Sequence, residues 1–128
     1  MAISKPWYET WSREKIEQEV PEESAGIYEL GASWADIPDD IVYIGCSSAS
    51  NGIQARLIDH LSGQNKKPGV KKFRFRLPEN ADADTAGGSQ GIFESTNAFT
   101  TRLEAAHLRR FQERHGQLPR YNDRIPSV

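Results

Sequence analysis

The chain has 128 residues, of which 37% are hydrophobic and 27% charged, with a formal net charge of −2 at pH 7. This composition is typical of a globular domain and excludes a disordered or fibrous chain. No apolar run approaches the roughly 20 residues of a membrane-spanning helix, and no apolar signal-peptide core begins the sequence. We therefore expect a single domain over residues 1–128, with no membrane partner and a cytoplasmic location.

Acidic and basic side chains are distributed unevenly along the chain. Residues 1–40 carry a net charge of −7, whereas residues 41–128 carry +5. A polyanion such as DNA would meet a positive local field over the second part. The alternative, that the asymmetry serves only solubility, stays open at this point.

The first predicted element is a helix over about residues 7–20, which ends at Pro21 because proline cannot continue a helix. Its aromatic and apolar side chains recur at helical spacing, which is more typical of core packing than of a base-stacking surface. We expect four of them to pack on the edge of a sheet: Trp7, Tyr8, Trp11 and Ile16.

Two β-rich runs follow, over residues 25–30 and 41–45, separated by a loop that contains glycine, proline and aspartate. Each run contains one tyrosine, Tyr28 in the first and Tyr43 in the second. Antiparallel pairing of these strands would bring the two phenols close together on one surface. We interpret the aspartates of the loop as solvated turn residues rather than a metal cluster.

The only cysteine, Cys46, directly follows the second run, and a single cysteine excludes an internal disulfide. Its place near the phenols makes a nucleophilic role a candidate, but no Cys-His-Asn set stands at a suggestive spacing. We therefore interpret Cys46 as a small apolar filler.

A helix is predicted over about residues 52–61, and Gly63 ends it. Arg56 and His60 are four residues apart, so they lie one above the other on the flank of the apolar face. A guanidinium and an imidazole in this place are positioned to meet a phosphate. An ion pair of Arg56 with Asp59, and a half-buried packing role for His60, remain as alternatives.

A third strand is predicted over residues 70–77, with phenylalanine and leucine facing inward and basic side chains facing solvent. The outward row and the preceding lysines would form a basic patch that contacts nucleic acid. An edge strand protected from pairing by charge is an equal alternative, and both can hold at once. The patch consists of Lys66, Lys67, Lys71, Lys72, Arg74 and Arg76.

After a long polar loop over residues 78–91, the longest helical pattern covers residues 94–115 and ends at Gly116. Glu104 falls on the edge of the apolar side of this helix. A carboxylate held against the core is costly unless it has a partner, and the partner is either a metal cation or a guanidinium. Glu104 is therefore a candidate metal ligand, with an ion pair to Arg56 or a bond to a hydroxyl neighbour as the alternative.

Two triplets, Gly26-Ile27-Tyr28 and Tyr43-Ile44-Gly45, resemble the signature of the GIY-YIG nuclease family letter for letter. The resemblance extends over about residues 20–124, because further family positions follow in the same order. These positions are Arg56, His60, Glu104 and Asn122.

The resemblance implies an α/β (α+β) fold in which a small three-stranded sheet is flanked by helices. It implies a metal-dependent endonuclease that hydrolyses DNA phosphodiester bonds with one metal ion, Mg²⁺ or Mn²⁺. Glu104 would be the single protein ligand of that ion, and Arg56 would contact the phosphate. Hard cations of this kind suit a carboxylate and water shell.

The resemblance also gives roles to the remaining positions. Tyr28 or Tyr43 would deprotonate or position the attacking water, although a phenol pKa near 10 has to be lowered by the metal or by Arg56. His60 would bond to a tyrosine or phosphate oxygen, and Asn122 would orient the backbone or the phosphate.

Two other classes of function stay open. One is a nucleic-acid-binding module with weak or no catalysis. The other is a nuclease subunit that depends on a protein partner for specificity, because family members usually carry an additional DNA-binding domain or insert. The second class predicts an apolar patch on the N-terminal helix.

Overall fold

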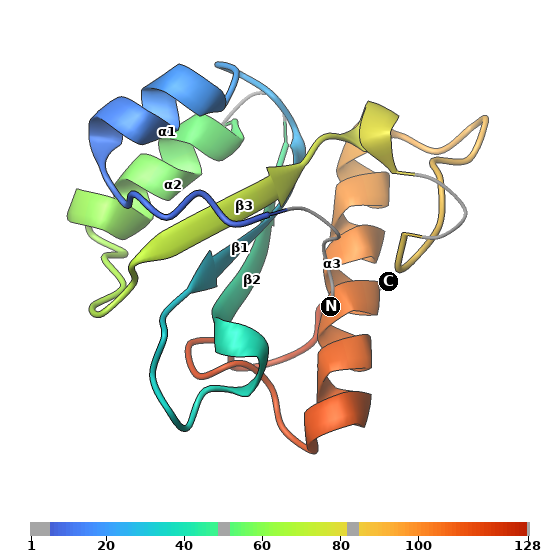
Figure 1. The fold of residues 1–128 in the computed structure, drawn as a ribbon. Helices are drawn as coiled ribbons and strands as arrows, with labels where there is room; N and C mark the ends of the chain where they lie inside the picture. The colour runs from blue at the N-terminus through green and yellow to red at the C-terminus, as the bar shows by residue number, and fades with distance from the viewer. Residues whose placement is uncertain (1–5, 49–51, 82–84, 128) are drawn as a thin grey trace.

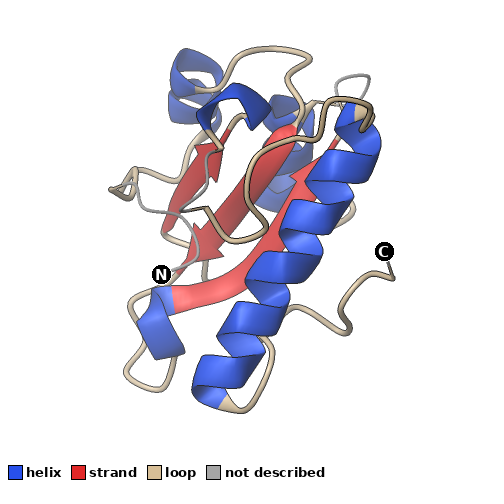
Figure 2. Cartoon of the chain, turned by 90° about the vertical axis from the view of Figure 1, so that its right-hand side faces the viewer, coloured by secondary structure: helices blue, strands red, loops and turns tan. Residues whose placement is uncertain are grey.

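The structure is a computed structural model that describes residues 6–48, 52–81 and 85–127. It has three layers, which Figure 1 and Figure 2 show from two sides. Two short helices, α1 (Arg13–Glu19) and α2 (Ile53–Ser62), cover one face of the sheet, and the long helix α3 (Thr96–His115) covers the other. The mixed α and β class that the sequence predicts is confirmed. No helix among the described residues is long and apolar enough to cross a bilayer.

The sheet has three antiparallel strands in the order β2-β1-β3, so β2 forms one edge and β3 the other. The strands are β1 (Gly26–Gly31), β2 (Ile41–Ser47) and β3 (Lys72–Arg76), close to the predicted ranges. Two single turns of 3₁₀ helix, Pro38–Asp40 and Pro78–Asn80, precede β2 and follow β3.

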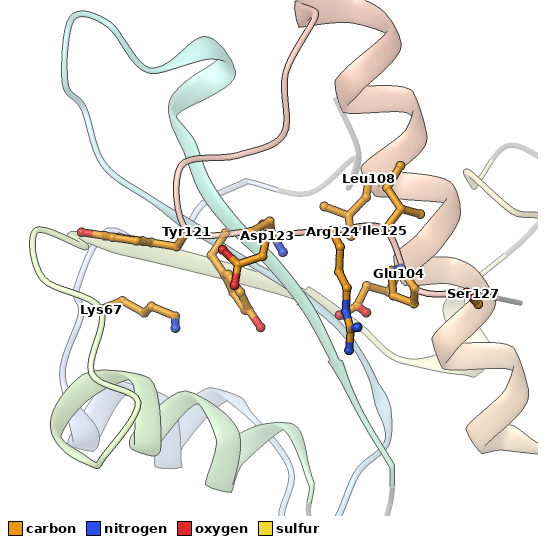
Figure 3. A pocket seen from close by; sticks show the side chains of 11 residues that line it. Lys67, Glu104, Leu108, Tyr121, Asp123, Arg124, Ile125 and Ser127 are labelled. Carbon is orange, nitrogen blue, oxygen red and sulfur yellow. The ribbon is translucent and has the colours of Figure 1, made fainter.

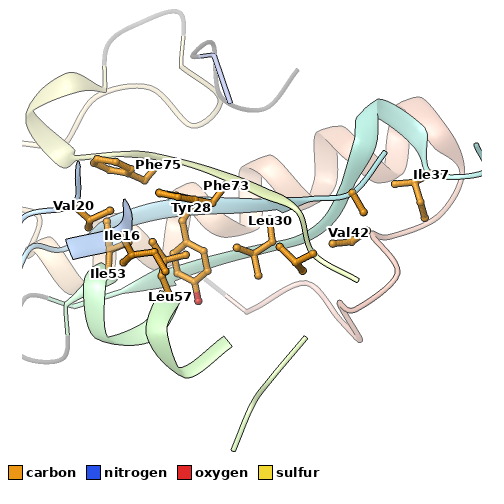
Figure 4. Close-up of a cluster of buried hydrophobic side chains, with 12 residues drawn as sticks. Ile16, Val20, Tyr28, Leu30, Ile37, Val42, Ile53, Leu57, Phe73 and Phe75 are labelled. Atoms are coloured by element: carbon orange, nitrogen blue, oxygen red, sulfur yellow. The ribbon is translucent and has the colours of Figure 1, made fainter. Parts of the chain in front are cut away.

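Two hydrophobic cores lie on the two faces of the sheet, because successive side chains of a strand point to opposite faces. Tyr28 and Leu30 belong to the core beneath α1 and α2, where Figure 4 shows the ring of Tyr28 among aliphatic side chains. Ile27 belongs to the second core, where Phe99 and Leu103 of α3 cover it. Adjacent residues of β1 therefore serve different halves of the molecule.

The predicted N-terminal helix begins later than expected. The Ser12 hydroxyl accepts a hydrogen bond from the backbone N–H of Lys15 and starts α1 at Arg13. Before this cap the chain is extended, and Tyr8 exchanges two backbone hydrogen bonds with Phe73 of β3. The Tyr8 ring also stacks on Phe73, with ring centroids 5.1 Å apart. The expected packing on the sheet edge is confirmed for Tyr8 and Trp11, which both contact Phe73, and it favours the extended backbone over another helical turn. Trp7 instead packs against the second core, and Ile16 is buried in the first.

The expectation that β3 presents a solvated basic row is wrong for two of its three members. Lys72 and Arg74 are only 5% and 1% exposed. Lys72 Nζ lies 2.9 Å from an Asp40 carboxylate oxygen, and Arg74 Nε lies 2.6 Å from Oε1 of Glu29. Trp7 covers both cations, with the Arg74 guanidinium carbon 4.0 Å from its ring centroid. The alternation rule fails here because the chain preceding α1 folds over this face.

The loop predicted over residues 78–91 is joined to α3 in its described part. The Arg102 guanidinium donates to the carboxylate of Glu94 and to two loop carbonyl groups. Next to this anchor, Ile92 and Phe93 are 95% and 99% exposed. They are the exposed large hydrophobic side chains of the described residues, so the apolar surface lies before α3 and not on the N-terminal helix.

Candidate functional site

Tyr28 is the centre of a buried hydrogen-bond network. Its hydroxyl lies 2.8 Å from Nε2 of His60, whose Nδ1 lies 3.2 Å from the carbonyl oxygen of Asn65. A carbonyl oxygen only accepts, so Nδ1 carries the proton, Nε2 of the neutral ring is an acceptor, and the Tyr28 hydroxyl donates to it. Burial lowers the pKa of His60 and so favours the neutral ring, as do the nearby positive charges of Lys67 and Arg56.

Arg56 and Tyr43 complete this network. The Arg56 guanidinium donates a hydrogen bond to the Tyr28 oxygen. Tyr43 shares a hydrogen bond with Tyr28. The ring centroids of the two tyrosines lie 6.2 Å apart, and those of Tyr43 and His60 lie 5.1 Å apart. Strand pairing thus brings together two phenols, an imidazole and a guanidinium.

Gly45 makes room for this arrangement. It lies directly opposite Tyr28 in the register of β1 and β2. A Cβ atom at this position would stand 2.6 Å from the Tyr28 hydroxyl and 2.7 Å from the ring of Tyr43. The glycine that ends the second triplet is therefore required by the close approach of the two phenols.

The outer edge of β2 is covered by groups from the C-terminal half of the chain. The backbone N–H of Tyr121 donates to the Val42 carbonyl oxygen at 2.9 Å. The Asn122 amide forms two 2.9 Å bonds with Ile44, accepting from its N–H and donating to its carbonyl oxygen. Asn122 therefore replaces a neighbouring strand at an edge that would otherwise expose unpaired backbone groups.

Glu104 is the next group along the same edge. Both the backbone and the side chain of Cys46 form hydrogen bonds with its carboxylate. Residues two apart in a strand are separated by about 6.7 Å, so the carboxylate lies one strand repeat beyond the Asn122 amide. The edge thus positions Glu104 where it can reach past β2 toward the side of the sheet that carries the phenols.

The electrostatics of Glu104 connect it to the tyrosine network. Burial raises its pKa, while hydrogen bonds from Cys46 and the positive charge of Arg56 lower it. The negative charge of Glu104 in turn raises the pKa of Tyr43, next to the larger effect of burial. The carboxylate and the phenols therefore act on one another across the edge of β2.

Both phenols are protonated at neutral pH. Burial raises the pKa of Tyr28 well above its ordinary value of 10.0 and also raises that of Tyr43. Arg56 acts in the opposite direction on both groups, as the sequence suggests, but burial outweighs it. A phenolate is therefore not the resting state of either residue.

Cys46 is a half-buried thiol beside Glu104. Burial and the adjacent carboxylate raise its pKa to about 12. The thiol stays protonated at pH 7, which agrees with a packing and hydrogen-bonding role and argues against a nucleophile.

The network opens on a pocket of about 510 Å³, which Figure 3 shows from close by. Tyr43, Glu104 and Asn122 line it, whereas Tyr28 lies behind Tyr43 in the core. The C-terminal segment 121–127 forms one wall of the pocket and crosses β2 toward α3 (Figure 3). Tyr43 is therefore the phenol that meets a molecule bound in the pocket.

The predicted nucleic-acid contacts are only partly close to this pocket. Lys67 lines it, with its Nζ 4.9 Å from the ring centroid of Tyr43. Lys66 and Lys71 are exposed on neighbouring turns, and Arg76 is half-buried with Nη1 donating to the carbonyl of Asn80. Lys72 and Arg74 point away from solvent into their ion pairs, as described above.

Two charged lining residues were not predicted from the sequence. Arg124 and Asp123 reach the pocket from the irregular C-terminal segment, where no periodic pattern indicates which way a side chain points. The only local signal is Asn122, which fixes the segment to β2.

Comparison of the chain with protein-family models, with curated proteins and with solved structures gave no match. Within the described ranges, no three or more histidine, cysteine, aspartate or glutamate side chains form a group that could hold a metal ion. A metal at Glu104 would therefore take the rest of its ligands from water and from a bound substrate.

Proposed function

We propose that the chain is a metal-dependent endonuclease of the GIY-YIG type that hydrolyses phosphodiester bonds in DNA. The observation that carries the proposal is the convergence of two phenols, one imidazole, one guanidinium and one carboxylate at the edge of β2. These groups come from three secondary-structure layers, and two of them, Tyr43 and Glu104, line one pocket. Such a set suits the transfer of a phosphoryl group to water, because it offers proton acceptors and charge stabilisation at one place.

The proton of the attacking water is removed through the tyrosine network. Tyr43 accepts the water proton on its oxygen while its own proton passes to Tyr28, and the Tyr28 proton passes to Nε2 of His60. The hydroxide forms the new bond to phosphorus, and the bond from phosphorus to the leaving oxygen breaks. This relay does not need a free phenolate, which the raised pKa values of both phenols disfavour.

Arg56 stabilises the negative charge that develops on the phosphate. Its Nε atom is buried and has no hydrogen-bond partner among the residues that the structure describes. The guanidinium is held by Tyr28 and its positive charge acts on both Tyr43 and Glu104, so it is fixed before substrate binds. Preorganised donors of this kind are worth about 10²–10³-fold in rate.

The residues of the pocket fit a hard divalent cation. Glu104 presents a carboxylate at the pocket wall, and burial raises its pKa although Cys46 and Arg56 oppose the shift. Mg²⁺ commonly binds through one or two carboxylates while it keeps several water ligands. Mg²⁺ or Mn²⁺ at Glu104 would supply charge stabilisation at the leaving oxygen.

The proposal is tested by incubating the protein with supercoiled plasmid and Mg²⁺ or Mn²⁺. We expect nicking by the wild type and its loss in Glu104→Gln and Arg56→Ala, with Glu113→Gln on the same helix as the matched control. Equal nicking by all four proteins would overturn the proposal, because the activity would then come from a contaminant. DNA binding without metal-dependent cleavage would instead support a binding module.

A second candidate, a nuclease subunit that acts with a protein partner, is favoured by one observation. Ile92 and Phe93 are almost fully exposed on a loop that Arg102 holds against α3. Adjacent exposed apolar side chains on an anchored loop are typical of an interaction surface. If this candidate holds, nicking by the purified chain is weak and rises on addition of a partner. Ile92→Ser with Phe93→Ser would remove that stimulation without changing the basal nicking.

A further inference from the structure

The pocket contains two cations that the catalytic proposal does not use. Lys67 lies near one end, above the rings of Tyr43 and Tyr121 at 4.9 and 6.0 Å from their centroids. Arg124 lines the same pocket from the C-terminal segment (Figure 3). Neither side chain forms an ion pair or side-chain hydrogen bond within the part of the chain that the structure describes, although Asp123 lines the same pocket.

Both cations are attached to fixed backbone. The Lys67 backbone N–H donates to the His60 carbonyl oxygen at 2.8 Å, which ties its turn to the end of α2. The segment that carries Arg124 is tied to β2 by the two amide bonds between Asn122 and Ile44. The two charges are therefore carried by different parts of the pocket wall, Lys67 by the turn after α2 and Arg124 by the C-terminal segment.

The size of the pocket limits what can occupy it. A volume of about 510 Å³ lies within the range of roughly 300–1,000 Å³ typical of small-ligand sites, which is too small for a duplex. It admits the backbone of one strand. A strand that crosses the pocket with its reacting phosphate at Tyr43 and Glu104 presents the neighbouring phosphates to the two cations.

We propose that Lys67 and Arg124 bind the phosphates on either side of the reacting one, so that the pocket is a three-phosphate site for a single nucleic-acid strand. This inference rests on the proposed function and deepens it. The C-terminal segment 121–127 then has a role in substrate binding, as the wall that supplies one of the two flanking contacts.

The test measures binding separately from cleavage, on a background of Glu104→Gln to prevent turnover. The dissociation constant for a fluorescent single-stranded oligonucleotide is measured from 50 to 300 mM salt. The salt slope is the slope of the logarithm of the association constant against the logarithm of the salt concentration, and each phosphate contact of a single strand contributes about 0.7 to it. We expect Lys67→Ala and Arg124→Ala each to reduce the slope by about that amount and the double variant by about twice as much. Arg109→Ala, an exposed cation elsewhere on α3, serves as the control and leaves the slope unchanged.

A second arm locates the contacts on the strand. Neutral methylphosphonate groups are placed one at a time next to the cleaved bond and cleavage by the wild type, Lys67→Ala and Arg124→Ala is compared. On one side of the cleaved bond, we expect a methylphosphonate to slow cleavage by the wild type but not to slow cleavage by Lys67→Ala any further. On the other side, we expect it to slow the wild type but not to slow Arg124→Ala any further.

Unchanged salt slopes in both variants would overturn the three-phosphate site while metal-dependent nicking by the wild type still supports the proposed function. Equal effects of every methylphosphonate in all three proteins would also overturn it. If the wild type does not nick the plasmid but the variants reduce the salt slope as expected, the proposed function alone is contradicted.

Discussion

Tyr28 and Glu29 are neighbours in β1, and both are polar side chains with 0% exposure. Tyr28 donates a hydrogen bond to His60 and accepts one from Arg56. It also shares a hydrogen bond with Tyr43, which lines an open pocket. Glu29 faces the opposite side of the sheet and is paired with Arg74 beneath Trp7. Tyr43 of the first cluster lines a pocket, whereas the side chains of Glu29 and Arg74 are 0% and 1% exposed in the described structure.

The difference shows that burial of polar groups does not by itself identify a functional site. Burial raises the pKa of Glu29 to about 7 although Arg74 opposes the shift, and a perturbed carboxyl of this kind is often taken as a sign of catalysis. Neither Glu29 nor Arg74 lines any of the five pockets found among the described residues, so we interpret the pair as structural. The perturbed Tyr43 and Glu104, by contrast, line a cavity together. Access to a substrate separates the two cases.

The largest expected effect concerns the closed cluster, which is the buried pair of Glu29 and Arg74. Arg74→Met leaves the Glu29 carboxylate buried without its cation, and breaking a buried pair in this way costs about 3–5 kcal/mol of unfolding free energy. Urea unfolding monitored by tryptophan fluorescence measures the loss. The double variant Glu29→Leu with Arg74→Met is expected to recover most of it, because it leaves no buried charge. Equal losses in the single and double variants would show that shape, not charge, is what the pair provides.

The next effect concerns the open cluster, which is Tyr28 with His60, Arg56 and Tyr43. Arg56→Ala is expected to reduce the rate of plasmid nicking by about 10²–10³-fold, because it removes a preorganised donor at the phosphate. Its effect on unfolding free energy should be smaller than that of Arg74→Met, since Arg56 is only half-buried. A stability loss equal to that of Arg74→Met, with nicking per folded molecule unchanged, would place Arg56 in the same structural class as Arg74.

Gly45→Ala tests the close approach on which the open cluster depends. The added methyl group would lie 2.6 Å from the Tyr28 hydroxyl, so the ring has to move, at a cost of about 1–3 kcal/mol. Gly91→Ala is the matched control, because its Cβ would meet its nearest neighbour at 3.4 Å, an ordinary contact. Thermal unfolding of both variants gives the comparison. A cost at Gly45 no larger than at Gly91 would contradict the packing described for the two phenols.

Asn122→Ala removes the two hydrogen bonds that cover the backbone of Ile44. We expect a loss of about 1–2 kcal/mol in unfolding free energy, because the freed backbone groups are partly accessible to water. Hydrogen exchange of the Ile44 amide should accelerate while that of Ile27 in the central strand changes less. Unchanged protection at Ile44 would indicate that another group takes the place of the amide.

The pH dependence of stability and of nicking tests the open cluster through His60. The pKa of His60 in the folded protein is lowered from its ordinary value of 6.5. At a pH between 6.5 and this lower value, His60 therefore binds a proton in the unfolded chain but not in the folded one. Stability therefore falls as the pH drops through this window, and nicking falls about tenfold per pH unit below the folded pKa, because protonated Nε2 no longer accepts from Tyr28. Lys67, Arg56 and Asp59 are the charges that act on this ring. His60→Gln should abolish the acidic limb, and its persistence would assign the limb to another group.

Local patterns predicted much of the fold and most of the site. Two β-rich runs on either side of a turn-rich loop predicted β1 and β2, and helical spacing together with Gly116 predicted α3. The four-residue spacing of Arg56 and His60 placed both on the side of α2 that meets Tyr28.

What could not be predicted depends on contacts between segments far apart in the chain. Lys72 and Arg74 follow the alternation of a solvated face, but Trp7 covers both cations. Asp40 pairs with Lys72 from 32 positions away, and Glu29 pairs with Arg74 from 45 positions away. Arg124 lies in irregular chain, and its place in the pocket follows from the contact of Asn122 with β2. Periodicity carries no information about either arrangement.

The central claim is that the pocket at the edge of β2 holds a divalent cation at Glu104, within reach of Tyr43. Anomalous diffraction from a crystal soaked in Mn²⁺ tests this claim most directly. The account predicts one strong peak beside the Glu104 carboxylate, facing the pocket, and its absence in crystals of Glu104→Gln. A peak at the acidic loop between β1 and β2, with none at Glu104, would contradict it.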